Sequence, residues 1–343
     1  MSVSLQELEA RYAGVVSAKG ARFLLAKHVP DALAQLGLVR PQDKLVIYAD
    51  DFQEAFMERF PRESLRFVAE PTVESFSCAT VALSDAEHTF WFVNSIGGCG
   101  LRVPNVRSLA TAAHEHGAIL VADNTAPSLF GCRPLALGAD LCFEALDRVA
   151  AGELARKTVA VGWTGIASKI RDAKKTNPGR LQPPKNVFLA SLIQERCGQE
   201  AFDAAELVAI ECGLDTLSGR MQRHLDHARA LAEYLSCCDA IPSVAYPGLA
   251  SHPDHAVAAN VLFHGYGPAV DFELPAHVAA SAFIQQCRLN GRNRPAGGSY
   301  TRLSARDGGE GRFIRLFAGL DDPLAIADDL DQAMRWFCNP PEP

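Results

Sequence analysis

Asp123 is a residue whose type and place suggest chemistry, because it ends the apolar run 118–123 (AILVAD) and precedes Asn124 and Thr125. In an open parallel sheet, ligands bind outside the carboxyl ends of the strands, so this carboxylate would face a crevice and could be aimed at a cofactor or substrate. It could instead cap a helix or close an Asx-turn, as the following Asn and Thr suggest. The pattern alone favours this second role.

Histidines and cysteines were considered as metal ligands. His252 and His255 lie in the segment SHPDH, where their spacing could suggest a metal. The ten cysteines are scattered and form no CxxC pair and no Cys/His spacing typical of zinc. We therefore expect free or buried thiols in a reducing cytoplasm.

Composition restricts the class of protein. A chain of 343 residues that is 48% hydrophobic is long enough for two domains, and its net charge of −7 argues against a nucleic-acid or anionic-membrane partner. The sequence has no membrane-spanning apolar run, and its polar first residues are unlike a signal peptide. A cytoplasmic protein is expected.

The elements that must position Asp123 are visible in the first half of the chain. Short apolar runs at 44–49, 89–95 and 118–123 predict buried strands, and 106–117 predicts an amphipathic helix closed by Gly117. Alternating strands and helices predict an α/β fold with a mainly parallel sheet and helices on both faces.

A long helical pattern then runs from about residue 202 to 237, with a predicted interruption near Cys212 and Gly213. We expect it to bridge a large domain, residues 1–212, to a smaller domain within residues 213–343.

The smaller domain has its own predicted elements. Residues 269–275 and 313–320 are strand-like, and 323–337 form a closing helix. This pattern predicts a small α+β domain at the C-terminal end.

Several segments resemble one family. Residues 121–140 (VADNTAPSLFGCRPLALGAD) resemble the VDNTFATPYLQRPLELGAD segment of the Cys/Met-metabolism family of pyridoxal-phosphate (PLP) enzymes. This transsulfuration family includes cystathionine γ-synthase, cystathionine lyases and O-acetylhomoserine sulfhydrylase. Residues 213–235, 246–255 and 314–334 resemble it in the same order. The resemblance implies PLP fold type I, with a seven-stranded large domain, and homodimers or homotetramers with sites at subunit interfaces. The family carries a similar SHPxH turn without a metal.

Three site positions of the family are matched. The resemblance implies that Asp123 is the carboxylate that keeps the PLP ring nitrogen protonated. Arg315, in IRLFAG, matches the arginine that binds the substrate carboxylate, although an arginine snorkelling from a strand is the plain alternative. Phe52 falls where the family has a stacking tyrosine.

Other family positions are not matched. The family segment HSATKY aligns with EALDRV, residues 144–149, so the PLP lysine becomes Arg148. A guanidinium stays protonated and is a poor nucleophile towards an aldehyde, so no internal aldimine is expected. The phosphate-binding serine becomes Ala145, which removes a donor. The threonine becomes Asp147, which would bring a carboxylate near a phosphate dianion.

Further differences point the same way. The substrate-binding asparagine becomes Gly98, a serine becomes Pro295, and the phosphate loop corresponds only loosely to residues 17–21. The chain also starts too late to supply the family's N-terminal arm. Lys157, Lys169 and Lys19 could replace the missing lysine, but a solvated role is expected for each.

Three hypotheses remain open. The chain could be a degenerate member of the family, a pseudoenzyme that serves as a structural or regulatory subunit, alone or beside an active paralogue. It could bind a small amino acid or carboxylate, using Arg148 and Arg315 near Asp123. Alternatively, it could be an active carbon–sulfur lyase or γ-synthase-type transferase with PLP bound non-covalently or through another lysine. Fold alone does not decide among them.

Overall fold

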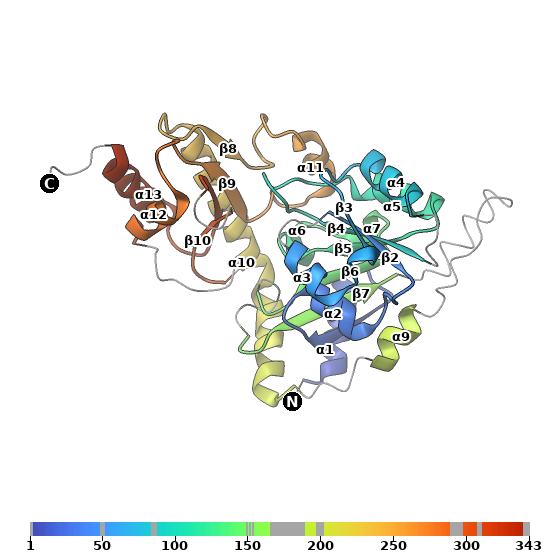
Figure 1. Ribbon diagram of the computed structural model, residues 1–343. Helices are drawn as coiled ribbons and strands as arrows, with labels where there is room; N and C mark the ends of the chain where they lie inside the picture. The colour runs from blue at the N-terminus through green and yellow to red at the C-terminus, as the bar shows by residue number, and fades with distance from the viewer. Residues whose placement is uncertain are drawn as a thin grey trace.

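The computed structural model describes residues 3–48, 52–83, 88–148, 150, 152, 154–164, 189–196, 202–288, 298–306 and 311–338. The elements form a larger and a smaller lobe, joined by the long helix α10 that runs along both (Figure 1). Within the described ranges, no helix combines the length and apolar character that crossing a bilayer would need.

The larger lobe is built on a seven-stranded sheet with the order β1-β7-β6-β5-β4-β2-β3. Its strands are β1 (Gly20–Leu25), β2 (Lys44–Tyr48), β3 (Leu65–Phe67), β4 (Thr89–Asn94), β5 (Ile119–Asp123), β6 (Leu141–Ala145) and β7 (Thr158–Trp163). Strand β7 is antiparallel to both β1 and β6, and the other pairs are parallel. The predicted strands at 44–49, 89–95 and 118–123 are confirmed, as is the mainly parallel sheet.

Helices cover both faces of this sheet, as expected for buried parallel strands. In β4, Phe90 and Phe92 face one core, whereas Trp91 and Val93 face the other, because side chains alternate along a strand. The first core is completed by α2 (Val29–Leu36), α3 (Gln53–Arg59) and α9 (Leu189–Arg196). The second is completed by α1 (Leu5–Val15), α4 (Val73–Val81), α5 (Val106–Glu115), α6 (Ser128–Gly131), α7 (Pro134–Leu137) and part of α10. A 3-10 turn, η2 (Arg62–Ser64), precedes β3.

Helix α10 (Ala204–Ser236) is continuous, so the interruption predicted near Cys212 and Gly213 is wrong. A glycine inside a helix costs only about 1 kcal/mol relative to alanine. That cost is offset by a capping box at Asp203 and by a buried stripe that continues past Gly213. Helix α10 packs on α1 and α6 at one end and on β8 (Ser243–Ala245), β9 (Ala269–Glu273) and α13 (Pro323–Cys338) at the other. The proposed division at residue 212 falls inside this helix.

The smaller lobe contains an antiparallel sheet with the order β10-β11-β9-β8. Its strands are β8 (Ser243–Ala245), β9 (Ala269–Glu273), β10 (Arg302–Ala305) and β11 (Phe313–Phe317). Helices α12 (Ala280–Gln286) and α13 (Pro323–Cys338) belong to this lobe, whereas α11 (His255–Val261) packs on the core of the larger lobe. The strand predictions at 269–275 and 313–320 and the closing helix are confirmed. One face of the sheet packs on α10, α12 and α13, which leaves the other face towards the larger lobe.

Candidate functional site

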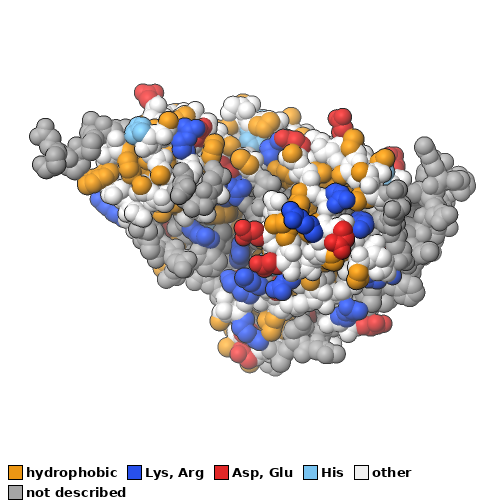
Figure 2. All heavy atoms as spheres, viewed as in Figure 1, with side chains coloured by type: hydrophobic (Ala, Val, Ile, Leu, Met, Phe, Trp, Pro, Cys, Tyr) orange, Lys and Arg blue, Asp and Glu red, His pale blue; other side chains and the backbone are white. Residues whose placement is uncertain are grey.

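A pocket of about 300 Å³ lies between the two lobes. The larger lobe contributes Phe52, Asn94, Ile96, Leu101, Asp123, Thr125, Ala126 and Arg148, and the region of the small sheet contributes Pro268, Ala269, Arg302, Ser304, Arg306, Arg315 and Phe317. Charged side chains of both signs gather where the lobes meet (Figure 2). The structure therefore brings together four of the residues that the sequence singled out: Phe52, Asp123, Arg148 and Arg315.

The wall from the larger lobe follows the carboxyl ends of parallel strands, where α/β sheets bind ligands. Asp123 ends β5 and is only 2% exposed. Its Oδ1 accepts hydrogen bonds from the backbone N–H of Thr125 at 2.9 Å and from the Thr125 hydroxyl at 2.5 Å, while Asn94 Nδ2 lies 3.5 Å from Oδ2. Asp123 thus closes an Asx-turn and also lines the pocket.

Phe52 lies immediately before α3 and is partly buried against the apolar core on that side of the sheet. Its ring lies 6.2 Å from that of His28, and its side chain lines the pocket. Phe52 therefore contributes an aromatic side chain to the wall of the pocket.

Arg148 follows β6, and its backbone N–H donates to the Ala145 carbonyl at 3.3 Å. Ala145 and Asp147 are buried and are not among the described residues that line the pocket. The carboxylate of Asp147 accepts from Lys157 Nζ at 2.9 Å and from the Thr158 N–H at 3.2 Å. The charge of Asp147 is thus engaged by its own neighbours, whereas the Arg148 side chain enters the pocket wall.

The part of the pocket wall formed by the small sheet follows from the alternation of side chains along its strands. Side chains alternate along a strand, so Arg302 and Ser304 of β10 share a face that Arg306 continues. Arg302 pairs with Phe317 of β11, and Ser304 pairs with Arg315. These four side chains and that of Arg306 therefore all face the pocket. The sequence analysis missed Arg302 and Arg306. Their signal was the alternation R-x-S-x-R in residues 302–306.

Arg315 is 3% exposed, so it does not snorkel to solvent. Its Nε donates to Asp271 Oδ1 at 2.6 Å and its Nη2 to Asp271 Oδ2 at 2.7 Å, a two-pronged ion pair between directly opposed residues of β11 and β9. Nη2 also donates to the Gly98 carbonyl at 2.6 Å. Asp271 Oδ2 accepts the Gly100 N–H at 3.1 Å. The guanidinium thus fastens the small sheet to the loop after β4.

Gly98 in that loop has no room for a side chain. Its φ is +68°, and a Cβ would lie 2.2 Å from the Tyr48 hydroxyl. An asparagine, the family residue inferred for this position, would therefore require Tyr48 to move.

Gly98→Ala is expected to lower the free energy of unfolding by more than about 2 kcal/mol, since left-handed backbone strain and overlap with Tyr48 act together. Gly117→Ala is the matched control, because Gly117 has φ +70° and nothing within 4 Å of an added Cβ. Urea denaturation would compare the two variants. Equal losses would show that the Tyr48 overlap contributes nothing, and adding Tyr48→Phe should recover part of the Gly98→Ala loss.

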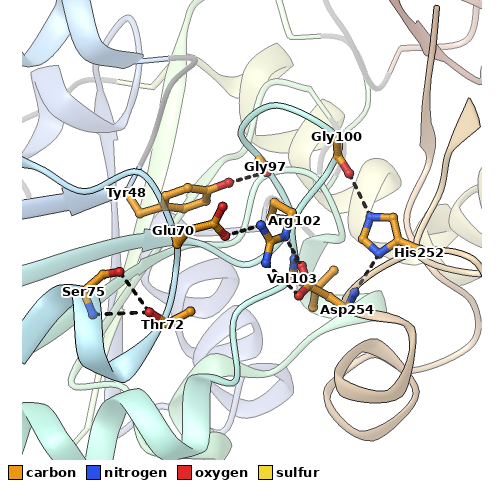
Figure 3. Close-up of polar contacts among 10 residues, drawn as sticks. All are labelled: Tyr48, Glu70, Thr72, Ser75, Gly97, Gly100, Arg102, Val103, His252 and Asp254. Atoms are coloured by element: carbon orange, nitrogen blue, oxygen red, sulfur yellow. Dashed lines mark hydrogen bonds and ion pairs between the residues drawn. The ribbon is translucent and has the colours of Figure 1, made fainter. Parts of the chain in front are cut away.

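His252 has a structural role. Its Nε2 donates to the Gly100 carbonyl at 2.8 Å, and its Nδ1 accepts the Asp254 N–H at 3.1 Å (Figure 3). Burial lowers its pKa, which suits this neutral ring. Asp254 in turn accepts from Arg102 Nε at 2.5 Å and from the Val103 N–H at 2.9 Å. The Nε2 bond of His252 thus joins its turn to the loop after β4, whereas the Nδ1 bond closes the turn itself.

His255 also bonds to backbone, with Nδ1 2.8 Å from the Pro247 carbonyl oxygen. Across the part of the chain that the structure describes, no group of three or more His, Cys, Asp or Glu side chains is placed to hold a metal ion.

The lysines weighed as substitutes lie elsewhere. The Lys157 side chain is 45% exposed and paired with Asp147, and Lys19 is exposed. Neither is among the described pocket residues. Lys169 and Pro295 lie outside the described residues.

Comparison with known proteins defines the class. A model of the family described as Cys/Met metabolism PLP-dependent enzyme matches residues 32–335, and the chain belongs to that family. The fold is that of the PLP fold-type-I enzymes. It is similar to the crystal structure of an apo methionine gamma lyase from Micromonospora echinospora, with a TM-score of 0.79 and 26% identity over 96% of this chain and 86% of that one.

Two curated relatives are also similar. O-acetyl-L-homoserine sulfhydrylase 1 of Thermus thermophilus is 29% identical, with 97% of this chain and 87% of that protein covered. Cystathionine gamma-lyase of Bos taurus is 29% identical, with 70% of this chain and 58% of that protein covered.

Proposed function

We propose that this chain binds a small amino acid or carboxylate in the pocket between its lobes and does not carry PLP on a lysine there. The observation that supports this most directly is the position of Arg148. It lines the pocket together with Asp123 and Phe52, and no lysine lines it among the described residues. Since a guanidinium keeps its proton, Arg148 is suited to binding an anion and not to attacking a carbonyl.

The described residues fit PLP only in part. Asp123 and Phe52 suit a protonated heteroaromatic ring, which is the feature that the family shares. A covalent link would need an amine, and Arg148 offers none. Asp147, at a position inferred to face the phosphate, holds Lys157 and Thr158 instead. We derive no chemical step through the cofactor for this chain.

Arginines dominate the polar side of the pocket, which suits carboxylate recognition. Among the lining residues that the structure describes, Arg148, Arg302, Arg306 and Arg315 stand against one carboxylate, that of Asp123. Guanidinium groups bind carboxylates by paired hydrogen bonds, and partial burial strengthens such contacts. A small anionic ligand therefore fits the charge of the site.

The proposal also includes the oligomeric state and a role as a subunit. We expect a homodimer or homotetramer in the cytoplasm, or association with an active paralogue, in which the chain would act as a structural or regulatory subunit. A stable monomer by light scattering would contradict the subunit role.

A PLP-dependent carbon–sulfur lyase or transferase is the second candidate, favoured by membership of the family and by the activities that its relatives' names state. It requires a different lysine or non-covalent PLP. The exposed, ion-paired Lys157 gives it little support.

Titration with PLP, followed by borohydride reduction and intact mass, separates the two candidates. We expect no added pyridoxyl mass and no absorption band of a protein-bound aldimine, because no lysine lines the described part of the pocket. A lysine-bearing cystathionine gamma-lyase treated in parallel is the positive control. One pyridoxyl group added at stoichiometric PLP would overturn the proposal, and peptide mapping would identify the lysine.

A further inference from the structure

Two of the four pocket arginines differ from the others in their surroundings. The guanidinium groups of Arg148 and Arg302 both line the pocket, and neither makes a hydrogen bond or ion pair with a described residue. They come from opposite lobes, one after β6 and one on β10. Partly buried charges are costly when they lack a partner, so this pair is suited to a ligand that brings negative charge.

Arg315 is in the opposite situation. Asp271 already occupies it with two hydrogen bonds, and the Gly98 carbonyl accepts a third. A ligand carboxylate at the Nε–Nη2 edge of Arg315 would have to displace an intramolecular carboxylate that is held in place by the sheet and by the Gly100 N–H. Arg315 is therefore better described as a positioning residue than as the ligand's anchor.

Like-charge repulsion also acts across the pocket. Burial lowers the pKa of Arg302, and the positive charge of Arg148 lowers it further. Because both guanidinium groups line one pocket, a ligand with two negative groups could bind both of them and offset this repulsion. Asp123, which lines the same pocket, provides a carboxylate for a ligand ammonium group.

We propose that the ligand is a dicarboxylic amino acid whose two carboxylates are bound by Arg148 and Arg302 and whose ammonium group faces Asp123. This rests on the proposed amino-acid binding and adds the ligand class and its anchors. The three groups that would contact the ligand, Arg148, Arg302 and Asp123, together carry a net +1, and such an amino acid carries a net −1 at neutral pH. The apolar walls at Phe52 and Phe317 accommodate the carbon chain between the charged ends.

The test compares amino acids that differ only in the second carboxylate. Titration calorimetry and thermal shift of the purified full chain would use L-glutamate and L-aspartate against L-glutamine and L-asparagine. We expect the acids to bind about 10- to 100-fold more tightly than the amides, the range for a charged hydrogen bond in a partly buried site. Glutarate, which lacks the ammonium group, should bind more weakly than glutamate because it faces Asp123 without compensation.

Arg302→Gln tests the anchor. The variant should fold, because the Arg302 side chain has no partner to lose among the described residues, and it should bind glutamate about 10- to 100-fold more weakly while leaving glutamine unchanged. Arg148→Gln should weaken glutamate binding by a similar factor and should weaken glutamine binding as well, because glutamine retains the carboxylate that Arg148 would bind. Arg229→Gln is the matched control, because it removes the same charge from an arginine that is 69% exposed on α10 and does not line the pocket.

The outcomes separate the inference from the proposed function. If glutamate and glutamine bind equally, amino-acid binding stands but the dicarboxylic class is wrong. If glutamate is preferred but Arg302→Gln and Arg148→Gln have no effect, the assigned anchors are wrong. If no amino acid or carboxylate binds and PLP adds a pyridoxyl group, the proposed function fails as well.

Discussion

Asp271→Ala is expected to lower the free energy of unfolding by about 3–5 kcal/mol, because it leaves the buried guanidinium of Arg315 without its counter-charge. The pair is almost fully enclosed, with side-chain exposures of 4% for Arg315 and 7% for Asp271. The variant also removes the acceptor for the Gly100 N–H. Urea denaturation monitored by circular dichroism would measure the loss.

Two further variants show whether the loss comes from the buried charge. Asp215→Ala removes a carboxylate from the pair with Arg11, whose side chains are 42% and 59% exposed, and should cost less than about 1 kcal/mol. Adding Arg315→Met to Asp271→Ala should recover much of the stability, since replacing both partners of a buried pair by apolar groups is often neutral. A loss in Asp271→Ala no larger than in Asp215→Ala would mean that the Arg315 pair is not formed in solution.

The importance of this pair could not have been predicted from the sequence. Arg315 was identified from the segment IRLFAG, but its partner Asp271 lies 44 residues earlier and is brought opposite only by the β9–β11 register. Asp123 could be predicted from the sequence, because the strand pattern alone shows that it ends a strand and faces the crevice. Pairing registers between distant strands carry no comparable local signal, so the wall of Arg302 and Arg306 was missed.

The strands of the main sheet could be predicted because their signal is local in the sequence. Strands such as β4 and β5 are buried on both faces and read as continuous apolar runs, which are easily recognised. The antiparallel β7 has the same composition, so its direction depends on the chain path and not on its residues. The predicted break at Gly213 failed because local helix propensity was overridden by packing along α10.

Glu144 on β6 is expected to make stability depend on pH. It is fully buried, and burial raises its pKa to about 7 from an ordinary 4.5, although hydrogen bonds from Ser128 and Tyr12 oppose the shift. Between these two values the folded chain holds a proton that the unfolded chain has released, so stability falls as pH rises through the window. The gap corresponds to about 3 kcal/mol of stability lost between pH 4.5 and 8.

Glu144→Gln removes this titration and should flatten the dependence. Urea midpoints at pH 5, 6, 7 and 8 would be measured for both proteins, and wild type should lose about 2–3 kcal/mol relative to the variant across that series. Glu233→Gln is the control, because that carboxylate is 57% exposed and its removal should leave the wild-type slope in place. Parallel curves for wild type and Glu144→Gln would mean that Glu144 is ionised throughout. Its bonds from Tyr12 Oη at 2.9 Å and from Ser128 would then outweigh the cost of burying the charge.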